Sequence, residues 1–276
     1  MHYRLFRWFP KSAFSRLMGI LAERPWPGWL LRPVIWLYVR VYRIDMAHFE
    51  APEEGFPTFN AFFTRALRTG VRPLDSGARR IVSPVDGRVS ASGRIETGRL
   101  FQAKGMDYSL GELLAGGTVA ESYEQGAFLT LYLSPRDYHR IHSPCAGRVR
   151  RFSYTPGELW TVSPTGIASV PDLFARNERL LTVLDTQWGE LLLVAVGAMV
   201  VGKIRTVYHP IISNLAGAQP LAEDLAVPYA LEKGQELGRF ELGSTVILLF
   251  PRGVAALDAL APGEAVALGE GIGSFL

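Results

Sequence analysis

Hydrophobic residues recur at helical spacing in three stretches of the first 70 residues. Apolar side chains three or four positions apart share one face of a helix, so this spacing predicts three helices. We expect the first to begin at Ser12 as N-cap and to gather on one face Phe14, Leu17, Met18 and Leu21. We expect the third to begin at Thr58 as N-cap, to end by Gly70 and to pack in the core Phe59, Phe62, Phe63, Ala66 and Leu67.

The second predicted helix combines aromatic and basic side chains. It follows Pro25-Trp26-Pro27, and its apolar side holds Trp29, Leu30, Pro33, Trp36 and Leu37. A separate, narrower face holds Arg32, Arg40 and Arg43. Aromatic rings beneath and arginines at the edge are typical of a helix that lies in the headgroup layer of a membrane. The alternative is a helix that packs on the protein and leaves a solvated arginine face.

Charge is concentrated at the same end of the chain. Residues 1–50 contain eight Lys or Arg and three Asp or Glu, net +5, whereas the whole chain carries net +3. A basic segment rich in Trp, Phe and Leu favours an anionic membrane surface over nucleic acid as a partner. The longest apolar run, Leu191 to Val201, is shorter than the about 20 residues of a spanning helix and is interpreted as a buried strand. We therefore expect a peripheral protein on the cytoplasmic face of the cell membrane. The single cysteine, Cys145, is expected in the core and fits a reducing compartment.

From about residue 80, short apolar runs separated by Gly and Pro predict strands and turns. The segments at 83–89 and 143–149 share the pattern Ser-Pro-x-x-Gly-Arg-Val, and a similar turn-and-strand pattern recurs at 233–240 and 262–269. We therefore expect an α+β fold. A region of amphipathic, membrane-associating helices at 1–70 would precede, at 71–276, a mainly-β sandwich-barrel core that resembles lipoyl- and biotinyl-type hybrid barrels.

Three motifs in this β-rich part carry groups suited to acyl transfer. Gly243 and Ser244 lead into an apolar strand, and a serine hydroxyl can attack the preceding glycine carbonyl because glycine has no Cβ to hinder it. Asp86 lies in a turn, and His139 and His142 lie three residues apart. An acid, a pair of histidines and a serine are the parts of a nucleophilic site. Because Gly-Ser-Thr alone is common turn material, the interpretation depends on all three motifs.

Together these segments resemble the phosphatidylserine decarboxylases, the pyruvoyl enzymes that make phosphatidylethanolamine. The resemblance covers nearly the whole chain. It rests on Leu-Gly-Ser-Thr at 242–245, Pro-Arg-Asp-Tyr-His-Arg-Ile-His at 135–142, Pro-Val-Asp-Gly at 84–87, and Phe-Pro-Thr-Phe-Asn-Ala-Phe-Phe-Thr-Arg at 56–65 with Arg-Pro-Leu-Asp at 72–75.

The resemblance implies that the chain cuts itself between Gly243 and Ser244. The products would be a beta chain, 1–243, and an alpha chain, 244–276, in which Ser244 has become a covalent pyruvoyl cofactor. Asp86 and His142 would serve Ser244 as orienting acid and base. The implied substrate, phosphatidylserine, would form a Schiff base with the pyruvoyl group and lose CO2.

Other roles rest on weaker patterns. His139 is our candidate for the acid that reprotonates the carbon after CO2 loss. Tyr132 and Thr161 flank the motifs and are candidates for the substrate pocket, with ordinary core packing as the alternative.

Two further functions stay open on the residues alone. A noncatalytic lipoyl-like β domain on a membrane-binding arm would remain one full-length chain. A zinc-dependent hydrolase could use His139, His142 and Asp86, but the glutamate-containing helix of zincins is absent, and we expect no metal. The sequence also leaves open whether copies of the chain form a homo-oligomer.

Overall fold

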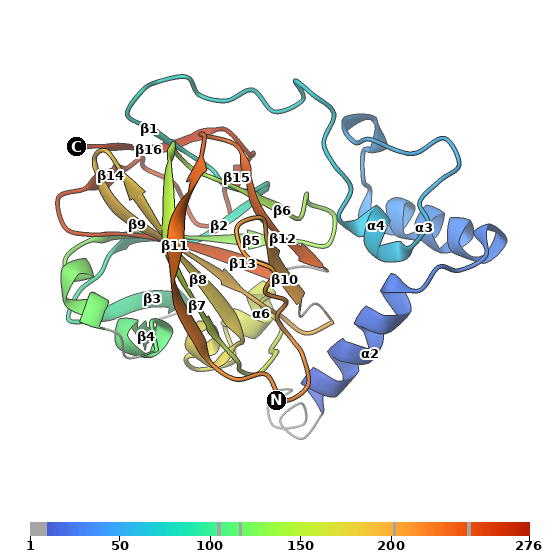
Figure 1. The fold of residues 1–276 in the computed structure, drawn as a ribbon, viewed down its shortest axis with the longest axis horizontal. Helices are drawn as coiled ribbons and strands as arrows, with labels where there is room; N and C mark the ends of the chain where they lie inside the picture. The colour runs from blue at the N-terminus through green and yellow to red at the C-terminus, as the bar shows by residue number, and fades with distance from the viewer. Residues whose placement is uncertain (1–9, 104–105, 116–117, 201–202, 242–243) are drawn as a thin grey trace.

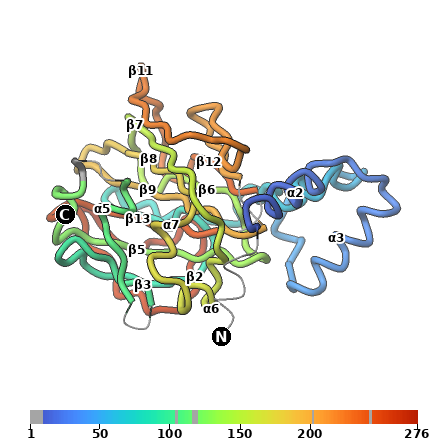
Figure 2. Tube along the Cα trace, turned by 90° about the horizontal axis from the view of Figure 1, so that it is seen from below, coloured from blue at the N-terminus to red at the C-terminus, as the bar shows by residue number. Residues whose placement is uncertain are grey.

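The first helices and the strands occupy separate parts of the molecule (Figure 1). The computed structural model describes residues 10–103, 106–115, 118–200, 203–241 and 244–276. The fold is α+β, with the N-terminal helices to one side of a mainly β core, as the view in Figure 2 also shows. The predicted class and the β-rich core are therefore confirmed.

Two longer helices dominate the N-terminal part. They are α2 (Lys11–Glu23) and α3 (Gly28–Tyr42), followed by the 3-10 turn η1 (Met46–His48) and the short helix α4 (Phe59–Phe63). The prediction that Ser12 caps the first helix is wrong, because α2 begins at Lys11 and Pro10 occupies the cap position without a side-chain hydrogen bond. A proline suits this end of a helix, where backbone N–H groups have no intrahelical acceptor.

The apolar side expected for α3 is largely exposed. Trp29 is 78% exposed and Trp36 is 61% exposed, whereas Leu31, which lies outside the predicted face, is buried. The helix therefore does not pack on the β core through these two tryptophans.

The start of α4 agrees with the sequence. Thr58 caps it as predicted, since its Oγ1 accepts a hydrogen bond from the Ala61 N–H at 3.0 Å. The helix is shorter than expected and ends at Phe63. The Arg65 guanidinium donates to the carbonyl oxygens of Phe62 and Phe63 at 3.3 and 3.5 Å, and so satisfies acceptors that a helix end leaves free.

One eight-stranded antiparallel sheet forms the largest part of the core. Its strand order is β11-β7-β8-β9-β13-β5-β2-β15. In that order the strands are Leu221–Leu231, Gly147–Thr155, Arg179–Thr186, Gly189–Val196, Ser244–Phe250, Ala127–Leu133, Gly87–Arg94 and Ala265–Val266. The strand predicted within the apolar run from residue 191 is thus confirmed as β9.

Smaller elements complete the core. One three-stranded sheet has the order β1-β16-β14 (Arg80–Val82, Gly271–Phe275, Ala255–Leu257), and another has the order β10-β12-β6 (Lys203–Thr206, Glu236–Glu241, Arg140–His142). The remaining elements are β3 (Arg99–Ala103) paired with β4 (Met106–Ser109), α5 (Leu110–Leu113), η2 (Thr118–Tyr123), α6 (Pro164–Ile167) and α7 (Leu173–Arg176).

The large sheet is open. Its edge strands β11 and β15 do not pair with each other in the part of the chain that the structure describes, and no closed barrel is found there. The lipoyl- and biotinyl-type barrel expected from the repeats is therefore not confirmed. Repeated turns specify where strands begin, but closure depends on whether two edges far apart in sequence meet.

The two Ser-Pro-x-x-Gly-Arg-Val segments bind each other reciprocally. The Val82 N–H donates to the Pro144 carbonyl at 2.9 Å, and the His142 N–H donates to the Pro84 carbonyl at 2.8 Å. Val82 and His142 each directly precede one of the two repeats, so the two hydrogen bonds are related by an approximate twofold. The sequence repeat is thus a structural repeat.

Each repeat also pairs with a second turn. Ser143 exchanges backbone hydrogen bonds with the Gly234–Gln235 turn, and Ser83 does the same with the Gly269–Glu270 turn. The sequence pattern matched the segment 233–240 with 262–269. In the structure, the counterpart of the Gly234–Gln235 turn is instead the Gly269–Glu270 turn, which lies later in the chain.

Two apolar clusters lie on opposite faces of the large sheet. Along β13, Val246 and Leu248 belong to one cluster, and Ile247 and Leu249 belong to the other, as the alternation of side chains in a strand requires. Cys145 is buried in the first cluster, as expected, and burial raises the pKa of its thiol to about 12. A thiol with this pKa stays protonated, which agrees with a packing role.

Gly269→Ala is expected to destabilise the protein more than Gly263→Ala. Both glycines have a left-handed φ, +85° and +88°, which costs an alanine roughly 1–2 kcal/mol. A Cβ at Gly269 would lie 2.8 Å from the Pro73 carbonyl oxygen, whereas at Gly263 it would meet no described atom within 4 Å. Overpacking adds about 1–3 kcal/mol, and each kcal/mol lowers Tm by about 2–4 °C. Thermal unfolding of both variants measures the difference, and equal losses would contradict the close contact at Gly269.

Candidate active site

Ser244 is the first residue of a central strand. It pairs with Leu133 of β5, and the next residue, Thr245, pairs with Val196 of β9. Ser244 is fully buried, and its Oγ has no hydrogen-bond partner among the described residues. A buried hydroxyl without a partner costs about 1–3 kcal/mol, so such a group in a native structure calls for an explanation. Gly243, the other half of the predicted cut site, lies outside the described residues.

Asp86 is held by an arginine. The Arg72 guanidinium donates to both carboxylate oxygens, at 2.9 and 2.7 Å, and the Leu268 N–H donates to Oδ1 at 2.8 Å. Two parallel hydrogen bonds of this kind fix a carboxylate firmly. Arg72 belongs to one of the motifs that carry the family resemblance, but sequence alone gave it no role.

His142 has both ring nitrogens engaged. Nδ1 lies 2.7 Å from the Gly234 carbonyl, which can only accept, so Nδ1 carries the hydrogen. In the neutral ring Nε2 then accepts from the Tyr138 hydroxyl at 2.9 Å. Burial lowers the pKa of His142, and the Gly234 carbonyl acts in the opposite direction. No hydrogen bond joins His142 to Asp86 or to Ser244 among the described residues, although the Asp86 charge contributes to the pKa of His142.

His139 is the more deeply buried of the two histidines. Its ring stacks on Phe63 at 4.1 Å between centroids, and neither ring nitrogen has a partner of good geometry among the described residues. Burial, and after it the positive charge of Arg65, lowers the pKa of His139 to about 3; the backbone at Ser134 acts weakly in the opposite direction. The ring is therefore neutral near pH 7.

Strand register places His139 nearer than His142 to the predicted cut. The Phe240 N–H donates to the His139 carbonyl, whereas His142 pairs with Glu236, four positions farther from Ser244 along β12. At about 3.3 Å per residue, the backbone of His142 lies on the order of 10 Å farther along the strand. The site thus has two parts: His139 beside the end of β12, and Asp86 with His142 at the other end of β6.

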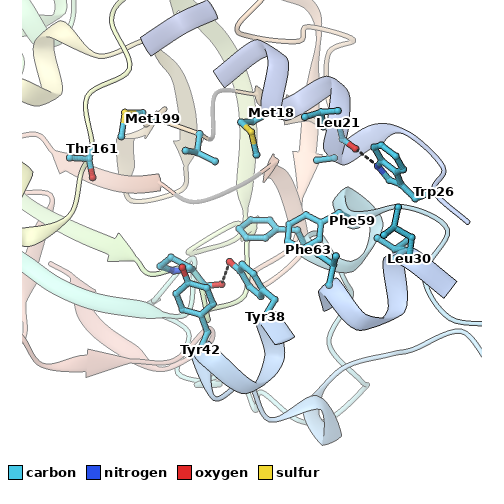
Figure 3. Close-up of a pocket in the computed structure, with 15 residues that line it drawn as sticks. Met18, Leu21, Trp26, Leu30, Tyr38, Tyr42, Phe59, Phe63, Thr161 and Met199 are labelled. Carbon is cyan, nitrogen blue, oxygen red and sulfur yellow. Dashed lines mark hydrogen bonds between the residues drawn. The ribbon is translucent and has the colours of Figure 1, made fainter. Parts of the chain in front are cut away.

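An apolar cavity of about 640 Å³ adjoins the first part (Figure 3). Figure 3 shows α2 and α3 facing each other across it, with Thr161 and Met199 of the β core toward one end. The Tyr38 hydroxyl at its floor donates to the Pro135 carbonyl at 3.0 Å. Phe63 lines the cavity and also stacks on His139, so a single aromatic ring lies between the cavity and the histidine.

The two predicted pocket residues lie in different surroundings. Thr161 lines this cavity. Tyr132 pairs with Thr245 and packs against the cluster that holds Ile247, on the face of β13 opposite to Ser244. It is not among the described residues that line the cavity.

Three further residues were missed by the sequence reasoning. Tyr138 holds His142, and Arg65 holds the end of α4 and acts on His139. Asp137 accepts hydrogen bonds from the backbone and side chain of Ser134, and its burial raises its pKa. All three lie inside the motifs quoted above, but their partners are distant or depend on a local turn that the motif does not reveal.

Two negative findings concern the described residues alone. They contain no group of three or more His, Cys, Asp or Glu side chains that could hold a metal ion, so the zinc alternative gains no support. None of their helices is both long and apolar enough to cross a bilayer.

Comparisons with known proteins decide the family. The family model for phosphatidylserine decarboxylase matches residues 59–274. The chain belongs to this family. It is 48% identical to the phosphatidylserine decarboxylase proenzyme of Anaeromyxobacter sp. (strain K), over 99% of this chain and 99% of that protein. Similar proenzymes occur in Myxococcus xanthus, 43% identical over 98% and 96% of the two chains, and in Alcanivorax borkumensis, 45% identical over 96% and 93%.

The burial of His139 predicts a pH-dependent stability. Its pKa in the folded protein, about 3, is below the ordinary value of 6.5, so between these pH values the unfolded chain binds a proton that the folded chain does not. Stability therefore rises with pH through this window and is lost as pH falls, by up to about 1.4 kcal/mol per pH unit. His139→Gln, which cannot titrate, should lose stability less steeply between pH 6 and pH 4 in urea titrations. Parallel curves for the variant and the wild type would contradict a neutral, buried His139.

Proposed function

We propose that this chain converts phosphatidylserine to phosphatidylethanolamine and CO2, through a pyruvoyl group made from Ser244 when the chain cuts itself between Gly243 and Ser244. The observation that carries the proposal is the buried Ser244 Oγ without a described partner, at the first residue of a central strand. This hydroxyl fits a serine destined for conversion, because no structural hydrogen bond has to be given up. When present, a pyruvoyl group supplies an electron sink for the negative charge that CO2 leaves behind.

The cut itself uses only groups of this chain. Ser244 Oγ forms a bond with the Gly243 carbonyl carbon, and the C–N bond between the two residues breaks to give an ester. Loss of the Cα proton of residue 244 then expels the Gly243 carboxylate, which keeps the serine oxygen. Water converts the remaining dehydroalanine to the pyruvoyl group and releases ammonia. Each proton transfer needs a base near Ser244.

We propose His142 as that base and Asp86 as its orienting acid. Tyr138 and Gly234 fix the tautomer in which Nε2 of His142 is free of hydrogen, as a base requires. In this structure the Tyr138 hydroxyl occupies Nε2, so the proposal requires this hydrogen bond to break or water to relay the proton.

His139 is our proposal for the proton source after CO2 loss. Because its ring is neutral near pH 7, it must first take up a proton. The phosphodiester and carboxylate charges of a bound substrate act in that direction, since a nearby negative charge raises the pKa of a histidine. The dry surroundings also favour loss of the substrate's carboxylate charge as CO2.

The apolar cavity suits the rest of a lipid. Its lining is almost entirely aliphatic and aromatic, and it lies between helices that expose further apolar side chains, among them Trp29 and Trp36. Arg32, Arg40 and Arg43 are exposed on the same segment. We propose that α3 contacts an anionic membrane at the cytoplasmic face, and that the acyl part of the substrate enters this cavity.

The cut is tested with Ser244→Ala. The variant should remain one chain of 276 residues and release no CO2 from phosphatidylserine vesicles, because it has no hydroxyl to convert. Wild-type protein should be two chains and active. Gel electrophoresis and a CO2-release assay on the same samples are sufficient, and an active Ser244→Ala chain would refute the proposal.

Replacing the two histidines should impair different steps, the cut for His142 and decarboxylation for His139. His142→Ala and Asp86→Ala should give folded but mostly uncut protein, whereas His139→Ala should still be cut in part and turn over at least about a hundredfold more slowly per pyruvoyl group. His209→Ala, at a half-buried histidine that packs against Phe152 and not against the proposed site residues, is the control. Carbonyl labelling counts the pyruvoyl groups, and normal cutting in both His142→Ala and Asp86→Ala would show that the base is another residue.

Vesicle binding should depend on the exposed tryptophans. Replacing Trp29 and Trp36 together by Ser should weaken binding to anionic vesicles by at least about tenfold, because each ring loses apolar burial in the membrane. Val227→Ser, at a residue of β11 that is 81% exposed, is the control. Co-sedimentation at several salt concentrations measures the binding. Equal loss in both variants would argue against α3 as the membrane contact.

A further inference from the structure

Four charged side chains join the end of α2 to the end of β12. Lys203 Nζ donates to Glu23 Oε1 at 2.5 Å, and Arg205 Nε donates to Glu241 Oε1 at 2.6 Å. Arg205 also lies 3.9 Å from Glu23, so one cation faces both carboxylates. We call Glu23, Lys203, Arg205 and Glu241 the clasp. Its formal charges balance, two against two.

The clasp differs from an ordinary surface ion pair because one side of it is buried. Glu241 is only 6% exposed and the side chain of Lys203 is 16% exposed, whereas Glu23 and Arg205 are 37% and 35% exposed. Glu241 Oε2 has no donor among the described residues. Removing one member of such a group leaves a buried charge without compensation, which is far more costly than losing an exposed pair.

Glu23 is poorly placed for the helix that contains it. It is the last residue of α2, where the carbonyl ends of the helix dipole disfavour an acidic side chain, and no basic residue occupies that last turn. The attraction of Lys203 and Arg205 therefore explains the position of Glu23 better than the helix does. A second contact holds the same helix, because the Val200 N–H donates to Ser15 Oγ at 2.9 Å.

The clasp is next to the predicted cut. Lys203 and Glu241 are directly opposite each other where β10 pairs with β12. Glu241 is the last residue of β12, and two residues separate it from Ser244. The clasp thus connects α2 to the end of β12, just before the bond that we propose is cut.

We propose that the clasp positions the Gly243–Ser244 bond for self-cleavage, with Glu241 as a positioning residue that acts through the backbone of β12 and Glu23 as its link to α2. The inference rests on the proposed self-cleavage. Attack of a hydroxyl on a neighbouring carbonyl needs a near-attack geometry, and a misplacement of about 1 Å can cost a hundredfold in rate. The consequence is an order of events: the chain cuts itself only after α2 has packed on the core.

Charge exchange across the clasp tests this proposal. Glu23→Lys sets three cations against Glu241, and Lys203→Glu sets three carboxylates against Arg205, whereas the double variant restores two charges of each sign. In a time course of newly synthesised full-length chain, each single variant should cut at least about tenfold more slowly, and the double variant should recover most of the wild-type rate. Glu53→Ala, an exposed residue of the same N-terminal part, should cut at the wild-type rate.

A second measurement separates positioning from general damage. Decarboxylation per pyruvoyl group in the matured fraction should stay within about twofold of wild type, because the clasp acts before turnover. If circular dichroism shows that a charge-reversal variant does not fold, the cutting rates of Glu241→Gln and Glu241→Ala are compared instead. The amide can still accept from Arg205 and should cut faster than the alanine variant.

The outcomes distinguish the two proposals. Wild-type chain that never cuts refutes the proposed function itself. Wild-type chain that cuts, with both single variants equally fast, overturns the clasp alone. Slow cutting without recovery in a folded double variant, or turnover that falls as far as cutting does, also overturns the positioning role.

Discussion

The pairing of β13 on both sides is the constraint on which the rest of the structure depends. Ser244 begins this strand, and β5 and β9 hold it along its length. A nucleophile in such a position has little freedom to lose before it reacts, and water has little access to it. The same ladders would keep residues 244–276 in the core after a cut, together with the pairing of β16 with β1 and of β15 with β2.

Burial also decides where charge can reside in the candidate site. His139 is neutral because its surroundings are dry and because Arg65, itself buried against the rings of Phe49 and Phe62, is cationic. Asp86 and His142 lie in a more polar region, with Arg72 and Tyr138 as partners. This division suits the two tasks that we propose: a proton transfer during the cut, and a later proton transfer to the product in a dry site.

Local chemistry could be predicted from the sequence, and distant contacts could not. Thr58 caps α4 because a threonine side chain and an N–H three residues later are enough to form that hydrogen bond. The reciprocal hydrogen bonds at Val82 and His142 could not be predicted, because they join segments about 60 residues apart. Only the repeated sequence pattern was visible. The open sheet and the Tyr138 hydrogen bond to His142 depend on tertiary packing, so no motif indicated them.

Mass spectrometry of the purified wild-type protein tests the central claim most directly, because it reads both the position of the cut and the chemistry of the new end. We expect two chains, residues 1–243 and 244–276, with the shorter one lighter by one ammonia than the unmodified peptide. That difference is the conversion of an N-terminal serine to a pyruvoyl group. An unmodified serine at the start of the shorter chain, or a fully active protein that remains one chain, would contradict the account.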